Sequence, residues 1–192
     1  DILIITNPED KKMFINLLGD GSRFGCSFQY EVQESPNGIA EAFIIGEQFI
    51  NNSSVALILG DNLFYGSGLG KILRKGNNPK GATVFAIEVD NPERYGVIQI
   101  DSQNKPISIE EKPKNPKSNL ALTGLYFYDN NVVEISKSIN PSSRGEKEIT
   151  AVNNVYLDKN NISVEVLPRG MTWIDAGTPD SIYKAGEFVK II

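Results

Sequence analysis

The chain has 192 residues and a net charge of −5, and this composition excludes several classes of protein. Its hydrophobic fraction of 40% and charged fraction of 22% are typical of a globular domain rather than a disordered chain. We expect no nucleic-acid partner, because a phosphate backbone requires clustered Lys and Arg. We expect no membrane partner either, since no apolar run approaches the roughly 20 residues that span a bilayer. A single cysteine, Cys26, fits a reducing, cytoplasmic location.

The chain contains no histidine. This absence excludes a Ser–His or Cys–His nucleophile pair and any metal site built on imidazole. Catalysis by this chain would have to use carboxylates, Lys, Arg, Tyr or backbone groups.

Strands and helices alternate through the first half of the chain. We predict strands at 2–5, 28–33, 55–59 and 82–89, and helices at 8–18, 38–49 and 69–75. Asn7 is expected to cap the first helix, and Pro8 to occupy its first position. The apolar run 55–59 is typical of a strand that is covered on both faces. The alternation predicts a doubly wound, mostly parallel sheet.

The second half of the chain differs, because it begins with a β-hairpin. We predict hairpin strands at 95–100 and 106–111, further strands at 122–128, 162–167 and 171–174, and helices at 131–139 and 148–158. Thr178 precedes a proline and an acid, which predicts the start of a last helix. No linker divides the sequence. We therefore expect an α/β fold, a Rossmann-like doubly wound mixed sheet, in a single domain over residues 1–192.

Two aspartates follow predicted strands directly. Asp61 comes after the strand 55–59, and Asp175 comes after the strand 171–174. Ligands of open α/β sheets bind beyond the carboxyl ends of the strands, and two such acids could converge on one hard cation such as Mg²⁺. The alternative, which the residues alone leave open, is that each is an ordinary turn aspartate.

Other candidate residues carry weaker signals. Glu111 could hold a pair of sugar hydroxyls, and Lys112 could bind a phosphate as a point charge. The alternative is that both belong to a solvated run of charges. Gln33 precedes a loop and could pair with a base edge through its amide, which both donates and accepts. Trp173 is interpreted as a core residue.

Seven segments together resemble the sugar-phosphate nucleotidyltransferases, and most closely the glucose-1-phosphate thymidylyltransferases. The segments are 32–40 (VQESPNGIA), 59–66 (LGDNLFYG), 93–97 (ERYGV), 109–114 (IEEKPK), 123–128 (TGLYFY), 144–146 (RGE) and 173–178 (WIDAGT). They occur in the family's order and cover essentially the whole chain. The resemblance implies the fold of a nucleotide-diphospho-sugar transferase.

The resemblance also implies roles for particular residues. Asp61 and Asp175 would be ligands of Mg²⁺ and, with Lys112, the catalytic residues. Gln33 and the backbone at Gly38 would recognise thymine. The residues that would bind the sugar phosphate are Tyr95, Gly96, Glu111, Lys112, Tyr126 and Arg144. The partners implied are dTTP and glucose-1-phosphate, and the full-length parent would be a homo-oligomer.

The reaction implied is attack of a sugar-phosphate oxygen on the α-phosphorus of dTTP, which yields dTDP-glucose and pyrophosphate. A phosphate monoester is already an anionic nucleophile at neutral pH, so the absence of histidine is consistent with this chemistry. Alignment of the reactants and stabilisation of charge are then the main requirements.

The sequence departs from the family pattern in three places. The family normally opens with a strand, a Gly-rich loop containing Gly-Thr-Arg and a later Pro-Lys segment, and none of these precedes Asp1. We therefore expect a catalytic domain truncated at its N-terminus and shortened after Ile192. Ala151 stands where the family usually has aspartate. Two alternatives stay open: a related enzyme that uses UTP, and a non-catalytic remnant that binds a sugar nucleotide.

Overall fold

The protein, seen here in a computed structural model, is described over residues 1–76 and 80–192. Its contacts divide it into two compact units, residues 1–53 with 130–152 and residues 54–129 with 153–192. Helix α6 (Ile149–Asp158) passes from the first unit into the second. A single catalytic domain over residues 1–192 stays a prediction.

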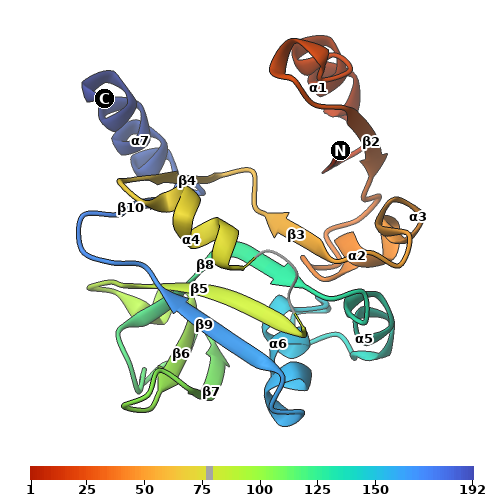
Figure 1. Ribbon diagram of the computed structural model, residues 1–192. Helices are drawn as coiled ribbons and strands as arrows, with labels where there is room; N and C mark the ends of the chain where they lie inside the picture. The colour runs from red at the N-terminus through yellow and green to blue at the C-terminus, as the bar shows by residue number, and fades with distance from the viewer. Residues whose placement is uncertain (77–79) are drawn as a thin grey trace. The chain divides into compact units, whose positions relative to one another are not determined.

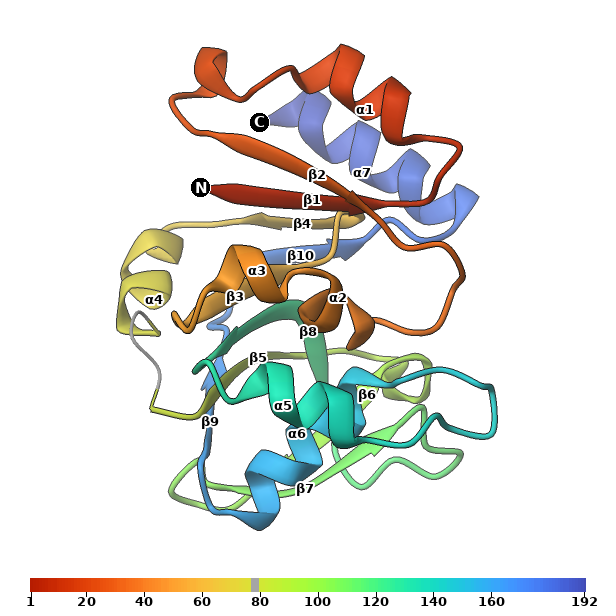
Figure 2. The ribbon, with the colours of Figure 1, turned by 90° about the vertical axis from the view of Figure 1, so that its right-hand side faces the viewer.

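A small parallel sheet opens the first unit. Strand β1 (Ile2–Thr6) pairs with β2 (Phe28–Val32), and α1 (Lys11–Leu18) connects them and lies beside them in Figure 2. The predicted helix start at Pro8 is wrong by three residues. The side-chain oxygen of Asn7 accepts a hydrogen bond from the backbone N–H of Asp10 at 2.8 Å. This bond closes a turn before the helix, so Asn7 does not cap α1 directly.

The other helices of the first unit are short. They are α2 (Glu41–Ile45), α3 (Glu47–Ile50) and α5 (Val132–Ser138). The single helix predicted over 38–49 is wrong, because the helix is interrupted at Gly46, which separates α2 from α3. Glycine is a poor helix former, and a Cβ at this position would lie 3.1 Å from the Leu3 side chain. Phe43 is nevertheless buried, as the apolar pattern predicts, and so is Ile50.

The second unit is built on a six-stranded mixed sheet in the order β7-β6-β8-β5-β9, with β3 also paired to β8. Its strands are β3 (Val55–Ile58), β5 (Ala82–Glu88), β6 (Gly96–Ile100), β7 (Pro106–Glu111), β8 (Leu120–Tyr128) and β9 (Ile162–Val166). The predicted mixed α/β class and the hairpin β6–β7 are confirmed. Only β5 and β9 pair in parallel in this sheet. It is thus more antiparallel than the strand–helix alternation predicts, because the hairpin and the long β8 join it.

A two-stranded antiparallel ribbon completes the second unit. It pairs β4 (Asn62–Tyr65), which the sequence pattern did not predict, with β10 (Thr172–Asp175), and the two strands lie side by side in Figure 1. Helix α4 (Leu69–Lys75) follows β4, and α7 (Pro179–Ile191) follows β10. The predicted cap at Thr178 is confirmed, since its side chain accepts a hydrogen bond from the Ser181 N–H at 3.2 Å.

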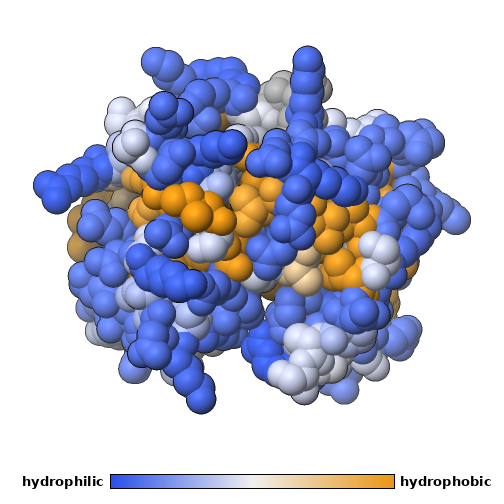
Figure 3. Space-filling view, turned by 90° about the horizontal axis from the view of Figure 1, so that it is seen from below, coloured by the Kyte–Doolittle hydropathy of each residue, from blue (hydrophilic) through white to orange (hydrophobic). Residues whose placement is uncertain are grey.

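One hydrophobic cluster in the core of the second unit comprises four buried side chains, those of Phe85, Leu125, Leu167 and Met171. Strand β3 contributes less to burial than predicted, because its residues alternate between covered and exposed and Ile58 is 57% exposed. The prediction that both of its faces are covered is therefore wrong. Some apolar side chains also gather at the surface, within the mostly hydrophilic face shown in Figure 3.

Three stacked tyrosines run through the interior of the second unit. The ring of Tyr128 lies 6.1 Å from that of Tyr126 and 5.6 Å from that of Tyr156. The Tyr128 hydroxyl donates to Asn153 Oδ1 at 2.5 Å, and the Tyr156 hydroxyl donates to Asp129 Oδ1 at 2.7 Å. Burial is the main reason why the pKa of each tyrosine lies above its usual value of 10.0.

These raised pKa values predict unfolding in alkali. Above pH 10 the unfolded chain loses phenolic protons that the folded chain retains, so the stability present below pH 10 is lost as the pH rises further. Ultraviolet absorbance of phenolate and circular dichroism, followed against pH, should show buried tyrosines ionising together with loss of structure. Tyr183→Phe, which removes the ionisable hydroxyl of an exposed tyrosine, should leave the unfolding pH unchanged. Ionisation of all seven tyrosines in a folded protein would contradict this prediction.

Candidate functional site

The two predicted cation ligands lie together in the second unit. Asp61 is in the turn between β3 and β4, and Asp175 ends β10. The backbone N–H of Ala176 donates to the Asp61 carbonyl oxygen at 2.8 Å, which joins the two segments. A Cβ placed on Gly177 would lie 3.1 Å from Asp175 Oδ1 and 3.3 Å from Asp61 Oδ2. The two carboxylates therefore converge on one point, and a side chain at position 177 would crowd that space.

This donor set fits Mg²⁺ shared with a substrate. Mg²⁺ usually takes one or two carboxylates from the protein and completes its octahedron with water and substrate phosphates. Within residues 1–76 and 80–192, no group of three or more His, Cys, Asp or Glu side chains is placed to enclose a metal ion. Two converging carboxylates thus suit a cation that arrives with a phosphorylated ligand.

The hairpin β6–β7 brings four predicted sugar-phosphate residues together. Gly96 is paired with Glu111 across the two strands. The backbone N–H of Lys112 donates to the Tyr95 carbonyl at 3.0 Å. Lys112 has a φ of 42°, in the left-handed region that non-glycine residues rarely adopt. Its surroundings therefore hold the lysine backbone in an unfavourable conformation at the end of β7.

Two tyrosines connect this hairpin with its surroundings. Tyr126 is buried on β8, and its pKa is raised by burial and, to a smaller extent, by the negative charge of Glu111. Burial also raises the pKa of Tyr95; the positive charge of Arg94 lowers it and the negative charge of Asp175 raises it. Each of these electrostatic effects requires the groups to be near each other. The negative charges of Glu111 and Asp175 are therefore within electrostatic range of Tyr126 and Tyr95, respectively.

Two further residues belong to this group, and neither was predicted from the sequence. The ring of Trp173 meets that of Tyr95 edge-on at 5.1 Å, and its indole N–H donates to Asn62 Oδ1 at 2.6 Å. Trp173 is half-buried and is not the core residue that was predicted. One signal was present: residues 173 and 175 share a face of the same strand.

The predicted base-binding residues lie in the first unit. The Gln33 amide nitrogen donates to the Gly38 carbonyl at 3.1 Å and to Glu41 Oε2 at 2.7 Å. Gly38 has a φ of 102°, and a Cβ there would lie 2.4 Å from the Lys147 carbonyl oxygen. No other residue fits this position, because the conformation and the space both require glycine. The structure therefore brings Gln33 and Gly38 together.

Arg144, also in the first unit, makes ion pairs with two carboxylates. Its guanidinium donates to Glu148 Oε1 from Nη2 at 2.8 Å and from Nε at 3.2 Å. Glu146 Oε2 lies 3.7 Å from the same Nη2 atom. A role for Arg144 in binding phosphate stays a prediction.

The whole chain matches an established family. Residues 1–191 fit the family model described as nucleotidyl transferase. The chain belongs to the nucleotidyl transferase family. It is 52% identical to glucose-1-phosphate thymidylyltransferase of Neisseria meningitidis. This match covers 100% of this chain and 67% of the relative. It is 53% identical to the enzyme of that name in Mycolicibacterium smegmatis, again over 100% of this chain and 67% of the relative.

Solved structures confirm the fold of this nucleotidyl transferase. A Bacillus anthracis protein assigned as a glucose-1-phosphate thymidylyltransferase, solved with sucrose, has a TM-score of 0.90 and 42% identity, over 100% of this chain and 77% of that one. A UDP-glucose pyrophosphorylase in complex with UDP-glucose has a TM-score of 0.82 over 99% and 81% of the two chains. Its identity is 23%, so this second likeness concerns the fold alone. In the described residues, every helix is too short or too polar to cross a bilayer.

Lys147 supports the Gly38 loop of this nucleotidyl transferase. Its backbone N–H donates to the Asn37 carbonyl at 2.6 Å, and its carbonyl accepts from the Ala40 N–H at 3.1 Å. Its ammonium group donates to three carbonyl oxygens at the end of α5, those of Ser136, Lys137 and Ile139, at 2.8, 3.1 and 2.9 Å. One lysine thus joins the loop of Gly38 to the C-terminus of a helix, where a cation is favoured.

Lys147→Met is expected to lower the free energy of unfolding by about 1–3 kcal/mol, because it leaves carbonyl oxygens without their donor. Urea denaturation followed by circular dichroism measures the change. Lys137→Met is the matched control: its exposed ion pairs with Glu47 and Glu134 contribute little. An equal loss of stability in the two variants would contradict the prediction.

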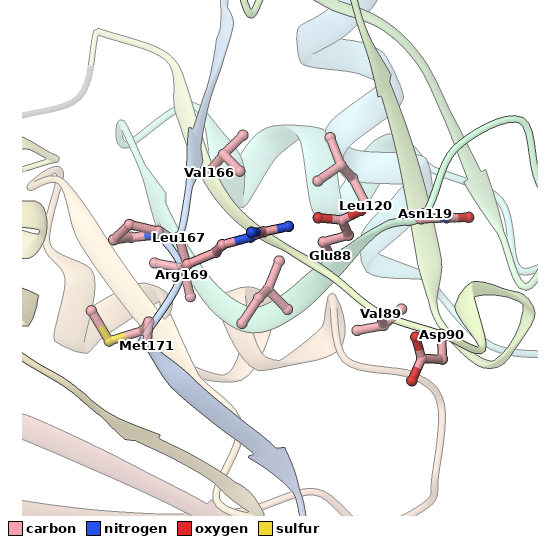
Figure 4. Close-up of a pocket in the computed structure, with 11 residues that line it drawn as sticks. Glu88, Val89, Asp90, Asn119, Leu120, Val166, Leu167, Arg169 and Met171 are labelled. Atoms are coloured by element: carbon pink, nitrogen blue, oxygen red, sulfur yellow. The ribbon is translucent and has the colours of Figure 1, made fainter.

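A separate cavity of about 590 Å³ lies in the second unit. Its lining, drawn in Figure 4, includes Glu88, Asp90, Asn119 and Arg169 among apolar side chains from β5, β8 and the segment after β9, and Arg169 extends across it. None of the predicted site residues is part of this lining. The cavity is therefore distinct from the carboxylate pair and from the hairpin.

Proposed function

We propose that the protein transfers dTMP from dTTP to glucose-1-phosphate in a Mg²⁺-dependent reaction, giving dTDP-glucose and pyrophosphate. Relatives that are 52% and 53% identical over the whole chain carry the name of this activity. The observation that carries the proposal is the convergence of Asp61 and Asp175 at Gly177. Tyr95 links this pair to the hairpin, because its ring meets that of Trp173 on the strand of Asp175 and its carbonyl accepts from the Lys112 N–H. We also propose a cytoplasmic location. The homo-oligomer expected of the full-length parent stays a prediction.

The second unit would bind and orient the sugar phosphate. In the proposed mechanism the ammonium group of Lys112 binds the negatively charged phosphate, and Glu111 accepts hydrogen bonds from sugar hydroxyls. Tyr126 is within electrostatic range of Glu111 and offers a phenol that burial keeps protonated. Tyr95 and Gly96 would form the wall next to the hairpin. These groups hold the phosphate oxygen in place for attack, which is where most of the rate enhancement of phosphoryl transfer arises.

Asp61 and Asp175 would hold Mg²⁺, which when bound neutralises negative charge on the phosphates. Their carboxylates have the oxygen donors that this cation prefers. The nucleophile is the phosphate monoester itself, which is anionic at neutral pH, so no histidine base is needed. Arg144 would contribute positive charge toward phosphate if it left its carboxylate partners.

The first unit would recognise the base. The Gln33 amide nitrogen already donates to Gly38 and Glu41, so its two hydrogens are both in use. Gln33 Oε1 is then the atom that accepts the thymine N3–H, while the backbone N–H at Gly38 donates to a base carbonyl. Uracil presents the same two groups. Discrimination would therefore rest on the thymine methyl group and the missing ribose 2′-hydroxyl.

Pyrophosphate release tests this proposal directly. The protein is given Mg²⁺, glucose-1-phosphate and either dTTP or UTP. We expect kcat/KM for dTTP to exceed that for UTP by about 10- to 200-fold, the range for one methyl-sized contact. Preference for UTP would overturn the assignment of the nucleotide. Absence of turnover with both, from folded protein, would favour the non-catalytic alternative.

A further inference from the structure

The side-chain amide of Asn62 makes three hydrogen bonds, each to a different part of the second unit. Its nitrogen donates to Asp61 Oδ1 at 2.8 Å. Its oxygen accepts from the backbone N–H of Gly124 at 2.9 Å and from the Trp173 indole N–H at 2.6 Å. The amide thus joins the turn before β4, the middle of β8 and strand β10.

The atoms involved leave the amide only one orientation. Both N–H donors, on Gly124 and Trp173, point at the oxygen of Asn62, so the nitrogen is turned toward Asp61. Gly124 and Trp173 lie in β8 and β10, where the sheet and the ribbon hold their positions. The direction in which Asn62 donates to Asp61 is therefore set by the fold and not by the exposed turn.

The packing around Asn62 depends on a glycine. A Cβ on Gly124 would lie 2.6 Å from Asn62 Oδ1 and 2.9 Å from Asn62 Nδ2. Carbon atoms do not approach polar atoms this closely, so any larger residue at position 124 displaces the amide. The position of the Asn62 amide thus requires a glycine at position 124, which is 62 positions away in the sequence.

We propose that Asn62 is a positioning residue that orients the Asp61 carboxylate for its cation. The donated hydrogen bond engages Asp61 Oδ1, while Oδ2 of the same carboxylate faces Gly177 and Asp175. The hydrogen bond thereby occupies Oδ1, and Oδ2 remains available to bind the cation. This proposal rests on the proposed function, in which Asp61 and Asp175 hold Mg²⁺.

Substitution of Asn62 should weaken cation binding more than it weakens the fold. For Asn62→Ala we expect the dissociation constant of Mn²⁺, used as a spectroscopic substitute for Mg²⁺, to rise by about 10- to 100-fold, as for other groups that orient metal ligands. We expect kcat to fall by a similar factor. Asn119→Ala removes an exposed amide from the same unit and should change neither quantity.

Trp173 supplies a readout that needs neither metal nor turnover. It is the single tryptophan of the chain, and its N–H is bonded to Asn62. The fluorescence emission of the metal-free protein should therefore shift in Asn62→Ala. It should remain unchanged in Asn119→Ala.

Gly124→Ala tests the same link without altering Asn62, Asp61 or Trp173. We expect it to raise the Mn²⁺ dissociation constant and shift the emission in the same direction as Asn62→Ala. The double variant should be no worse than the more affected single variant, because both changes remove one interaction. If Asn62→Ala fails to fold, Gly124→Ala alone carries the test.

The outcomes separate this proposal from the proposed function. Mn²⁺ affinity of Asn62→Ala within twofold of wild type, or additive effects in the double variant, would overturn the positioning role even in an active enzyme. If the wild-type protein transfers no thymidylyl group but both variants weaken Mn²⁺ binding non-additively, the role of Asn62 stands and the proposed function fails.

Discussion

Asp61→Asn is expected to abolish most of the Mg²⁺-dependent thymidylyl transfer while leaving the fold intact. Substitution removes the negative charge of one of the two carboxylates that converge at Gly177. We expect kcat/KM to fall by about 100- to 1000-fold, the cost of losing one group that stabilises charge in a transition state. Asp61 is exposed, and its backbone bond to Ala176 does not involve the side chain, so the unfolding curve should change little.

Asp90→Asn is the matched control for this variant. Asp90 also follows a strand of the second unit, β5, but it lines the separate cavity. Its substitution should leave pyrophosphate release unchanged. Wild-type turnover in Asp61→Asn would remove Asp61 from the cation site.

Lys112→Ala is expected to weaken glucose-1-phosphate more than dTTP. The lysine would contribute one charged contact to the sugar phosphate, worth about 1.5–3 kcal/mol, so KM for glucose-1-phosphate should rise by about 10- to 150-fold. KM for dTTP should change by much less. The backbone at 112 has a φ of 42°, which is equally unfavourable for Lys and Ala, so the substitution adds no strain.

Initial rates measured against each substrate in turn give the two KM values. Lys114→Ala removes an exposed lysine two residues further along and should affect neither. Equal weakening of both substrates by Lys112→Ala, or none, would count against a role in sugar-phosphate binding.

Much of this site could be predicted because its signals are local. Asp61 and Asp175 each stand at the end of a predicted strand, and Thr178-Pro179-Asp180 carries a cap, a proline and an acid in adjacent positions. The two strands of the hairpin and their connecting turn also lie within a few residues of one another. Such features depend on short stretches of chain, and the structure reproduces them with shifts of one or two residues.

The contacts of Asn62 could not be predicted in this way. Strand β4 is paired with β10, whose residues are about 110 positions away in the sequence, and no short pattern reports such a pairing. Asn62 follows an aspartate in a turn, where asparagine is common for local reasons. Its bonds to Gly124 and Trp173 exist only because the sheet and the ribbon meet. The same absence of long-range information made Trp173 look like a core residue.

Two wrong predictions concern the extent of a helix and the burial of a strand. The helix over 38–49 is predicted from its apolar spacing. That spacing contains no information about the close contact between Gly46 and the Leu3 side chain. The apolar run 55–59 favours a strand buried on both faces. Its residues in fact alternate between covered and exposed, as in any strand whose two faces have different surroundings.

Binding of Mn²⁺ to wild-type protein, Asp61→Asn and Asp175→Asn, followed by electron paramagnetic resonance in the presence of dTDP-glucose, tests most directly whether the two aspartates form one cation site. We predict one tightly bound ion in the wild-type protein and loss of that ion in both variants. Mn²⁺ binding at wild-type affinity in either variant would contradict a shared site at Gly177.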